Sequence, residues 1–314
     1  MDDIKTEWFF IVKPRAGSVK TMSLWVPAEQ KLQKLGISFV TAMTDHKRHA
    51  TELAFEAAQK GYRRIVAVGG DGSLHEVLSG IARHCDEKGV DPSGFTIGVM
   101  PIGSGNDWIK SLGLPNDLDN MISLIENESI GKMDLVRVLS SGGKVSYMAN
   151  VGGTGFDSHV CSRVNLQKEG GKRGKLIYLD ALRYTITHLS PINLKVLADD
   201  QPVFEGVCYS IALGNGRYSG SGMRQVPKAE IDDGILDYMI VPKVKLKTML
   251  KEIPRLFNGT IDESGVVVSG KCRSLRIMPL DDASADIIEL DGEIEGKLPL
   301  SIDMDGRQIH VIKG

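Results

Sequence analysis

Two glycine-rich segments hold the residue types whose spacing is suited to chemistry. The first is Gly69-Gly70-Asp71-Gly72-Ser73, and the second is Pro101-Ile102-Gly103-Ser104-Gly105-Asn106-Asp107. Glycine lets the main chain approach a ligand closely. A helix that begins behind such a loop offers unpaired N–H groups and the positive end of its dipole to a phosphate. The two segments therefore predict a site for a phosphorylated ligand.

Polar side chains within the loops strengthen this prediction. Asp71 could bind a magnesium ion or orient a phosphate, and Ser104, Asn106 and Asp107 add polar groups to the second loop. No Gly-Lys-Ser/Thr follows, so this is not a Walker A motif. It is not a GxGxxG dinucleotide fingerprint either, because that spacing ends in His75. A plain strand-to-helix turn is the structural alternative.

The elements that must position these loops alternate between strand and helix. Short β-branched runs predict strands at residues 8–13, 38–41, 65–68 and 96–100. Apolar spacing predicts helices at residues 23–35, 46–60, 73–85 and 118–126. This alternation indicates parallel βαβ units, with ligands at the carboxyl ends of the strands. Both glycine segments fall at that edge.

The second half of the chain has a different pattern. Residues 135–139 and 145–150 flank a turn and predict a hairpin, and a second turn at residues 198–202 joins two more strands. Further β-rich segments follow at residues 235–241, 265–269, 275–278 and 287–290. We therefore expect an α/β domain at residues 1–133 and a mainly antiparallel β domain at residues 134–301. Residues 302–314 could complete the second domain or return to the first.

Composition restricts the class of protein. The 314 residues carry a net charge of -2, with 42% hydrophobic and 25% charged residues, which is ordinary for a globular chain and gives no case for a nucleic-acid-binding surface. No apolar stretch approaches the about 20 residues needed to span a bilayer. The acidic N-terminus lacks a signal-peptide pattern. Four single cysteines without a CxxC pair suit a reducing compartment, so a cytoplasmic location is expected.

The motifs resemble one family closely. Residues 68–77 together with residues 100–107 resemble the catalytic domain of the diacylglycerol kinase superfamily, and within it the bacterial soluble lipid kinases. Four further segments support the resemblance in the expected order. They are residues 12–17, residues 44–50, residues 213–237 and residues 290–293.

The resemblance implies a two-domain fold similar to that of NAD kinase and phosphofructokinase: an N-terminal Rossmann-like α/β domain, a C-terminal β domain, and ATP in the cleft between them. It also implies the nucleotide contacts. These are Lys13, Pro14, Arg15, Ala16, Gly17, Thr44, Gly69, Gly70, Asp71, Gly72, Ser73, Leu74 and His75, with the second loop contributing Gly103, Ser104, Gly105, Asn106 and Asp107.

A magnesium site is implied at the Asp-Asp-Gly segment near residue 233. The resemblance gives the Asp233 side chain and the backbone carbonyls of Glu230 and Ile235 as its ligands. Hard oxygen ligands at a tight glycine turn suit this ion. An unmetallated β-turn is the alternative.

The proposed catalytic carboxylates lie near the end of the chain. The resemblance implies Glu293 as the acceptor of the hydroxyl proton, with Asp291 close by and Asp71 in the first loop. Residues two apart on a strand face the same way, so Asp291 and Glu293 could both point into one site. The alternative is a hairpin at Asp291-Gly292, with Glu293 and Glu295 on a solvated face.

Three residues depart from the usual family pattern. Lys13 replaces the common Asn before Pro14 and adds a possible phosphate cation. His75 and Ser104 are shared with sphingoid-base kinases, so the identity of the lipid is less secure than the type of reaction. His75 could equally be a helix-surface residue without a role.

Basic residues alternate with apolar ones at residues 243–257. This pattern permits docking on an anionic lipid surface, and the alternative is an ordinary helix packed on its own domain. A second basic stretch at residues 163–175, interrupted by glycines, is expected to be a substrate-side or solvated loop. The sequence leaves the oligomeric state open, with a homodimer as one alternative.

The sequence thus predicts a cytoplasmic ATP- and Mg²⁺-dependent lipid kinase, peripheral at the inner membrane surface, that phosphorylates the hydroxyl of a diacylglycerol-like lipid. The alternatives are a sphingoid-base or other lipid-alcohol kinase, an NAD kinase-like enzyme, and a non-catalytic nucleotide-binding protein.

Overall fold

The computed structural model describes residues 4–14, 21–103, 105–171, 175–188 and 190–314. The chain divides into two compact units. The first unit comprises residues 1–135 and 306–314, and the second comprises residues 136–305.

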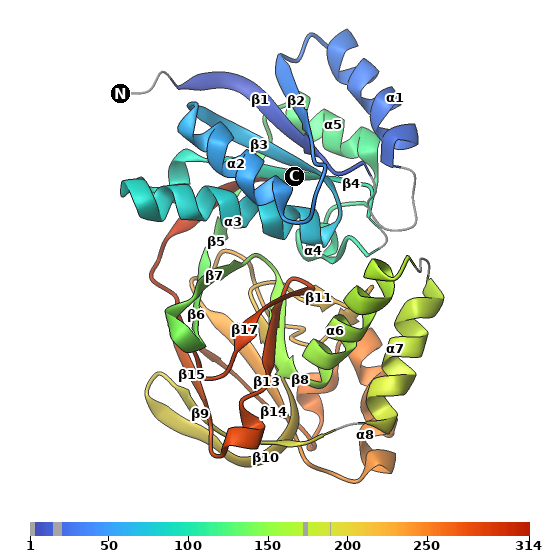
Figure 1. The fold of residues 1–314 in the computed structure, drawn as a ribbon, viewed down its shortest axis with the longest axis vertical. Helices are drawn as coiled ribbons and strands as arrows, with labels where there is room; N and C mark the ends of the chain where they lie inside the picture. The colour runs from blue at the N-terminus through green and yellow to red at the C-terminus, as the bar shows by residue number, and fades with distance from the viewer. Residues whose placement is uncertain (1–3, 15–20, 104, 172–174, 189) are drawn as a thin grey trace. The chain divides into compact units, whose positions relative to one another are not determined.

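The first unit contains a six-stranded sheet in the order β2-β1-β3-β4-β19-β5 (Figure 1). All neighbouring strands pair in parallel except β19 and β5, which are antiparallel. The strands are β1 (Lys5–Val12), β2 (Phe39–Met43), β3 (Tyr62–Gly69), β4 (Thr96–Pro101), β5 (Ile130–Asp134) and β19 (Gln308–Ile312). Of residues 302–314, which the sequence could place in either domain, Gln308–Ile312 form β19 of this sheet, while Ile302 and Asp303 end a strand of the second unit.

The α-helices described in the first unit are α1 (Thr21–Lys34), α2 (His49–Gln59), α3 (Asp71–Lys88), α4 (Asp107–Ser111) and α5 (Leu118–Glu126). Among them, α1 contacts α5 and α2 contacts α3. The strand interiors are fully apolar: Ile65 to Val68 of β3 are 0% exposed. Such buried runs are typical of parallel strands that are covered on both faces. The predicted α/β architecture is confirmed.

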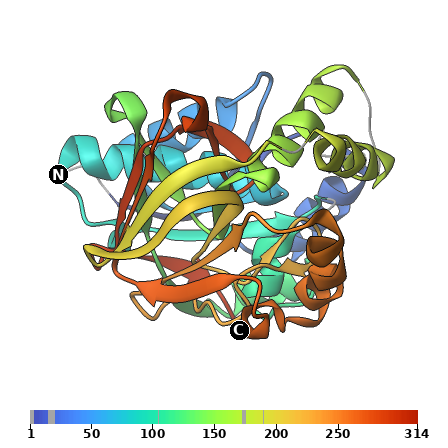
Figure 2. The same ribbon diagram turned by 90° about the horizontal axis from the view of Figure 1, so that it is seen from below.

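The second unit is built on an eleven-stranded sheet in which every pair is antiparallel. The main path is β17-β16-β8-β10-β9-β15-β18-β6-β7, with β13 paired to β10 and β14 (Figure 2). The strands are β6 (Val136–Ser140), β7 (Val145–Met148), β8 (Val151–Gly155), β9 (Ile192–Ala198), β10 (Gln201–Gly214), β13 (Leu236–Pro242), β14 (Val268–Cys272), β15 (Ser274–Pro279), β16 (Ile287–Leu290), β17 (Glu293–Lys297) and β18 (Leu300–Asp303). The predicted antiparallel β domain is confirmed.

The described part of the second unit also contains a short hairpin and three α-helices. The hairpin consists of β11 (Tyr218–Ser219) and β12 (Met223–Arg224), and the helices are α6 (Phe156–Glu169), α7 (Lys175–Thr187) and α8 (Leu246–Asn258). Alternating inward residues such as Ile192, Leu194 and Val196 of β9 fill the core. The expectation of a basic loop at residues 163–175 is wrong for Arg163 and Lys168, which lie in α6, because the helix continues until Gly170. Lys172 and Arg173 lie outside the described residues.

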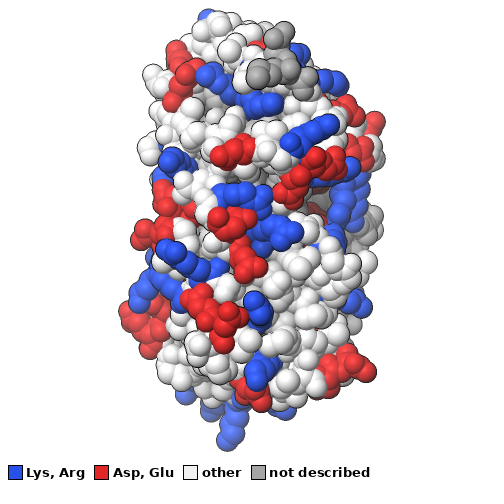
Figure 3. All heavy atoms as spheres, turned by 90° about the vertical axis from the view of Figure 1, so that its left-hand side faces the viewer, with Lys and Arg blue, Asp and Glu red and all other residues white. Residues whose placement is uncertain are grey.

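Charged side chains are interspersed on the face shown in Figure 3, where lysine and arginine alternate with aspartate and glutamate. No described helix is long and apolar enough to cross a membrane.

Candidate active site

The two glycine loops of the first unit pack backbone against backbone. They follow the neighbouring strands β3 and β4, in which Gly69 is paired with Pro101. The amides of Ile102 and Gly103 both donate to the Gly69 carbonyl, at 2.8 and 3.0 Å. A Cβ atom on Gly103 would lie 2.5 Å from the Cα atom of Gly70. Glycine is therefore required here by close approach.

Asp71 joins the first loop to the second. It is the first residue of α3, and its carboxylate accepts hydrogen bonds from the backbone amides of Asp107 (3.1 Å) and Trp108 (2.9 Å) at the start of α4. These amides belong to the first turn of a helix, where no intrahelical acceptor exists. Asp71 thus acts as a remote N-terminal cap that fixes the second loop.

Asn106 sits at the bend of the second loop. It adopts the left-handed conformation with φ of 51°, and its side chain donates to the Gly103 carbonyl and to Asn116. Its Oδ1 atom is buried and accepts no hydrogen bond from a described residue. Asp107, the next residue, is paired with Lys110 at 2.7 Å. Ser104 lies outside the described residues.

Helix α3 is buried at its third to fifth residues. Ser73, Leu74 and His75 are all at most 4% exposed, and the amides of Ser73 and Leu74 donate to the Gly70 carbonyl. The alternative of His75 as a helix-surface residue is therefore wrong. Because Gly70, Asp71 and Gly72 are only partly buried, their backbone is the part that a phosphate could approach.

Lys13 forms an ion pair that the sequence did not indicate. Its Nζ atom lies 3.0 Å from Glu76 Oε1, and the other oxygen of this buried carboxylate accepts from the Ala50 amide at 3.2 Å. Glu76 therefore links the end of β1 to the starts of α2 and α3. The predicted nucleotide contacts Arg15, Ala16 and Gly17 lie outside the described residues.

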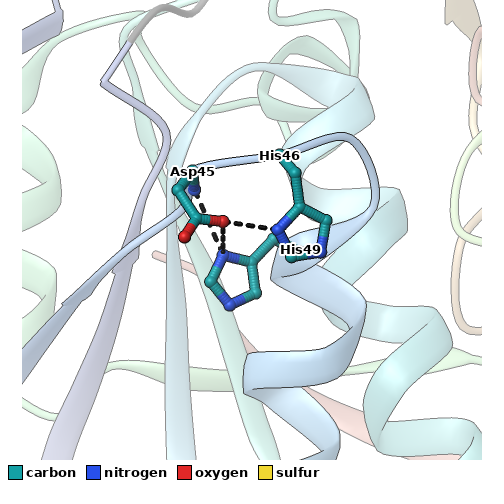
Figure 4. A group of neighbouring side chains, drawn as sticks. All are labelled: Asp45, His46 and His49. Atoms are coloured by element: carbon teal, nitrogen blue, oxygen red, sulfur yellow. Dashed lines mark hydrogen bonds and ion pairs between the residues drawn. The ribbon is translucent and has the colours of Figure 1, made fainter.

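Thr44 and the segment after it form the second predicted nucleotide contact. Thr44 is buried directly after β2, and its amide donates to the Val12 carbonyl at 2.9 Å. Figure 4 shows one carboxylate oxygen of Asp45 facing a nitrogen of both His46 and His49, whose imidazoles stack on one another. The hydrogen bond from His46 lowers the pKa of Asp45, and the same bond raises the pKa of His46. These three residues could hold a metal ion through nitrogen and oxygen atoms within 4.8 Å of one another.

The Asp291-Gly292 segment of the second unit is a hairpin turn between β16 and β17. Both residues have positive φ, 52° and 86°, as a type I′ turn requires. The carboxylate of Asp291 accepts from the amides of Ala149 (2.9 Å) and Asn150 (2.8 Å). Asp291 does not share a strand with Glu293, so the argument that strand alternation points both carboxylates the same way is wrong. The geometry makes Asp291 an anchor of the turn.

Glu293 is the first residue of β17 and is partly exposed. No described residue forms a hydrogen bond or an ion pair with its carboxylate. Its neighbour on the same strand differs: Glu295 is buried and is held by Lys144 at 2.7 Å and by the Ser146 hydroxyl at 3.0 Å. Of the two carboxylates, Glu295 is engaged by Lys144 and Ser146, whereas Glu293 has no such partner among the described residues.

Helix α6 supports the turn that carries Glu293. The Cys161 thiol and the Asn165 amide both donate to the Gly292 carbonyl, at 2.9 and 3.2 Å. Burial raises the pKa of the Cys161 thiol, and the nearby Glu289 and Glu293 carboxylates raise it further. Cys161 is therefore a neutral donor, and its role at the turn is structural.

The Asp-Asp-Gly segment of the second unit carries excess negative charge. Asp233 accepts from the Ile235 amide at 3.0 Å, and Lys271 lies 3.4 Å from Asp233 and 3.2 Å from Asp237. Burial raises the pKa of Asp237, and the charges of Asp233 and Glu230 add to this effect. The Asp237 oxygen that faces Lys271 is buried, and the Lys271 ammonium is the cation beside it. This donor set fits a divalent cation held by oxygen ligands.

Asp157 is a partly buried titratable residue that the sequence did not single out. It lies in the first turn of α6, and the Ser210 hydroxyl donates to it at 2.7 Å. Burial raises the pKa of this carboxyl. Its sequence signal is a carboxylate two residues after the glycine-rich strand β8.

Each half of the chain matches the model of a known protein family. Residues 7–138 match the family described as Diacylglycerol kinase catalytic domain, and residues 150–313 match the YegS C-terminal NAD kinase beta sandwich-like domain. A probable lipid kinase YegS-like protein of Xanthomonas campestris pv. campestris is 32% identical over 67% of this chain and 66% of its own length. A diacylglycerol kinase of Staphylococcus epidermidis is 26% identical over 92% of this chain and 86% of its own length.

Solved structures show the same fold. A diacylglycerol kinase from Bacillus anthracis superposes with a TM-score of 0.70 at 20% identity, covering 98% of this chain and 97% of that one. Yeast NADH kinase gives a TM-score of 0.52 at 10% identity, covering 98% and 83%. Because both family models match, the chain belongs to the diacylglycerol kinase catalytic-domain superfamily, in the branch whose second domain is the YegS C-terminal NAD kinase beta sandwich-like domain.

Proposed function

We propose that the protein transfers the γ-phosphoryl group of ATP to the hydroxyl of a diacylglycerol-like lipid. One observation carries the proposal: Asp71 fixes two glycine loops against each other at the carboxyl ends of neighbouring parallel strands. Ligands of open α/β sheets bind at this edge. Membership of a diacylglycerol kinase family supports ATP as the ligand.

The first unit would hold the nucleotide. Backbone amides of both glycine loops would face the phosphates, and the buried Asn106 oxygen would accept from a ligand or from a loop residue. The Lys13 ammonium is balanced by Glu76, so its first role would be to hold the end of β1 against α3. Magnesium bound to the ATP phosphates would neutralise part of the charge that develops during phosphoryl transfer.

Glu293 would act as the general base. It would accept the proton of the lipid hydroxyl while the hydroxyl oxygen bonds to the γ-phosphorus and the bond to the bridging oxygen of ADP breaks. A general base must be within hydrogen-bond reach of the proton that it accepts. The Glu293 carboxylate is not engaged by another described residue, which supports this role. The second unit would shape the lipid site and hold a structural magnesium ion at Asp233.

A lipid substrate places the reaction at a membrane surface. We propose that the enzyme works in the cytoplasm and contacts the inner membrane surface transiently. Relatives named as lipid kinases support a lipid acceptor.

The test is a panel of acceptors offered with radiolabelled ATP: diacylglycerol, sphingosine, ceramide and NAD. We expect label to pass to diacylglycerol in preference to the other acceptors. Preferential transfer to sphingosine or NAD would reassign the substrate. ATP binding without transfer to any acceptor would contradict the kinase proposal and favour a non-catalytic nucleotide-binding protein.

A further inference from the structure

Helix α8 of the second unit carries apolar side chains on an outer face as well as an inner one. On the inner face, Leu256 packs against a core cluster of the unit. On the outer face, Leu250 is 42% exposed and Phe257 is 56% exposed, with exposed Pro254 between them. Spacings of four and three residues place these three side chains in one stripe. The core does not account for this outer stripe.

Unpaired positive charge borders the stripe. Lys243, Lys245, Lys247 and Lys251 are exposed, and none forms an ion pair with a described residue. The helix has one carboxylate, Glu252, and it is paired with Arg255 at 3.1 Å. Lys247 and Lys251 lie beside the stripe by helical spacing. The helix therefore presents apolar side chains next to free cations.

Two neighbouring helices add to the apolar surface. Leu166 of α6 is 60% exposed, and Leu179 and Tyr184 of α7 are 58% and 42% exposed. Figures 1 and 2 show α6, α7 and α8 on the same side of the second unit. The β11–β12 hairpin connects them, because Gly220 lies against Tyr178 of α7 while β12 contacts α8. Single exposed apolar residues are normal, but a group on adjacent helices indicates a contact surface.

We propose that this surface docks on an anionic phospholipid bilayer, with Leu250 and Phe257 inserted and the lysines of α8 against the headgroups. An apolar stripe bordered by free lysines is the pattern of interfacial helices. Protein–protein interfaces are depleted in lysine, which favours a lipid surface over a protein partner. The inference deepens the proposed function, since a lipid substrate has to be taken from a membrane.

Vesicle sedimentation tests the surface without any catalytic step. The full chain is spun with vesicles of phosphatidylglycerol and phosphatidylcholine in equal parts, and with vesicles of phosphatidylcholine alone. We expect binding to the anionic vesicles that weakens as salt is added, because exposed charges are screened. Equal binding to both vesicle types, or no binding to either, would contradict the proposal.

Paired variants identify the binding helix. The double variant Leu250→Ala with Phe257→Ala removes the inserted apolar groups. The double variant Lys247→Gln with Lys251→Gln removes two positive charges. Each double variant should lower the vesicle partition coefficient at least about tenfold. The matched control is Leu139→Ala with Leu280→Ala, which alters apolar residues of similar exposure outside the three helices. Wild-type partition by both α8 pairs would overturn the proposal. Thermal unfolding of each variant shows that the fold is kept.

A soluble short-chain diacylglycerol separates this inference from the proposed activity. The α8 variants should phosphorylate it at the wild-type rate while losing activity on diacylglycerol in anionic vesicles. Equal loss on both substrates would contradict a docking role. Vesicle binding by a wild-type protein that phosphorylates neither substrate would keep the docking surface and refute the kinase proposal.

Discussion

The carboxylate of Asp71 accepts a hydrogen bond at 2.9 Å from the backbone amide of Trp108, a residue 37 positions later in the chain. Its second oxygen accepts from the neighbouring Asp107 amide. The aspartate of the first glycine loop thus caps the short helix α4 that follows the second loop. The geometry of each loop depends on the other, so one substitution should alter both.

Asp71→Asn tests this coupling. An asparagine side chain has one acceptor oxygen and would turn its NH₂ group toward the second amide, so one hydrogen bond is lost. We expect the free energy of unfolding to fall by about 1–3 kcal/mol and ATP binding to weaken. Urea denaturation and titration calorimetry measure the two effects. Asp117→Asn is the control, because Asp117 caps α5 and asparagine caps a helix as well as aspartate does. Unchanged ATP affinity in Asp71→Asn would refute the coupling.

Gly103→Ala tests the close approach of the loops. The added Cβ atom would meet Gly70 Cα at 2.5 Å and Asn106 Oδ1 at 2.6 Å. We expect a loss of about 1–3 kcal/mol in the free energy of unfolding together with impaired ATP binding. Gly94→Ala is the control, since a Cβ atom there has no described heavy atom within 4 Å. Equal stability of the two variants would show that the loops do not pack as described.

Glu293→Gln separates the proposed base from its structural neighbour. We expect unchanged thermal stability, retained ATP binding and a fall in turnover of at least ~100-fold. Glu295→Gln should instead lower the free energy of unfolding by about 1–3 kcal/mol, because Glu295 is the buried partner of Lys144 and Ser146. Near-wild-type turnover in Glu293→Gln would remove Glu293 from the role of base.

Magnesium should stabilise the second unit through the Asp233 loop. A ligand at about 100 times its dissociation constant adds ~2.7 kcal/mol to the free energy of unfolding. We expect the unfolding temperature to fall after chelation and to recover with magnesium, and Asp233→Asn to abolish the response. Asp200→Asn, in an exposed turn of the same unit, should keep it. A response that survives in Asp233→Asn would place the ion elsewhere.

The buried carboxyl of Asp157 should make stability depend on pH. Its folded-state pKa is raised above the ordinary value of 3.8 by burial. The folded state therefore binds the proton more tightly, and the free energy of unfolding falls as pH rises from about 3.8 through the folded-state pKa. Asp157→Asn keeps an acceptor for Ser210 and removes this dependence. Its stability relative to the wild type should increase with pH across that window. A constant difference would show that Asp157 stays ionised.

Local patterns predicted the elements that hold the loops. The β-branched runs before Gly69 and Pro101 mark β3 and β4, and the Asp291-Gly292 dipeptide signals the hairpin that the structure shows. The sequence could not show that Asp291 is held by the Ala149 and Asn150 amides, because this contact joins residues more than 140 positions apart.

Other features depended on tertiary context in the same way. Glu76 lies within the first motif, but its pairing with Lys13 joins residues 63 positions apart. Helix α6 has no clear separation of apolar and polar faces. The sequence therefore predicted a loop where the basic C-terminal part of this helix lies. On α8 the spacing showed an apolar stripe, while the exposed fractions of Leu250 and Phe257 distinguish its outer face from its inner face.

Transfer of the terminal phosphate of ATP to diacylglycerol is the most direct test of the proposed function. Purified protein is incubated with γ-labelled ATP, magnesium and diacylglycerol in mixed micelles, and the extracted lipid is counted. We predict labelled phosphatidic acid from the wild-type protein and at least ~100-fold less from Glu293→Gln. Unlabelled lipid from a wild-type protein that binds ATP would contradict the account.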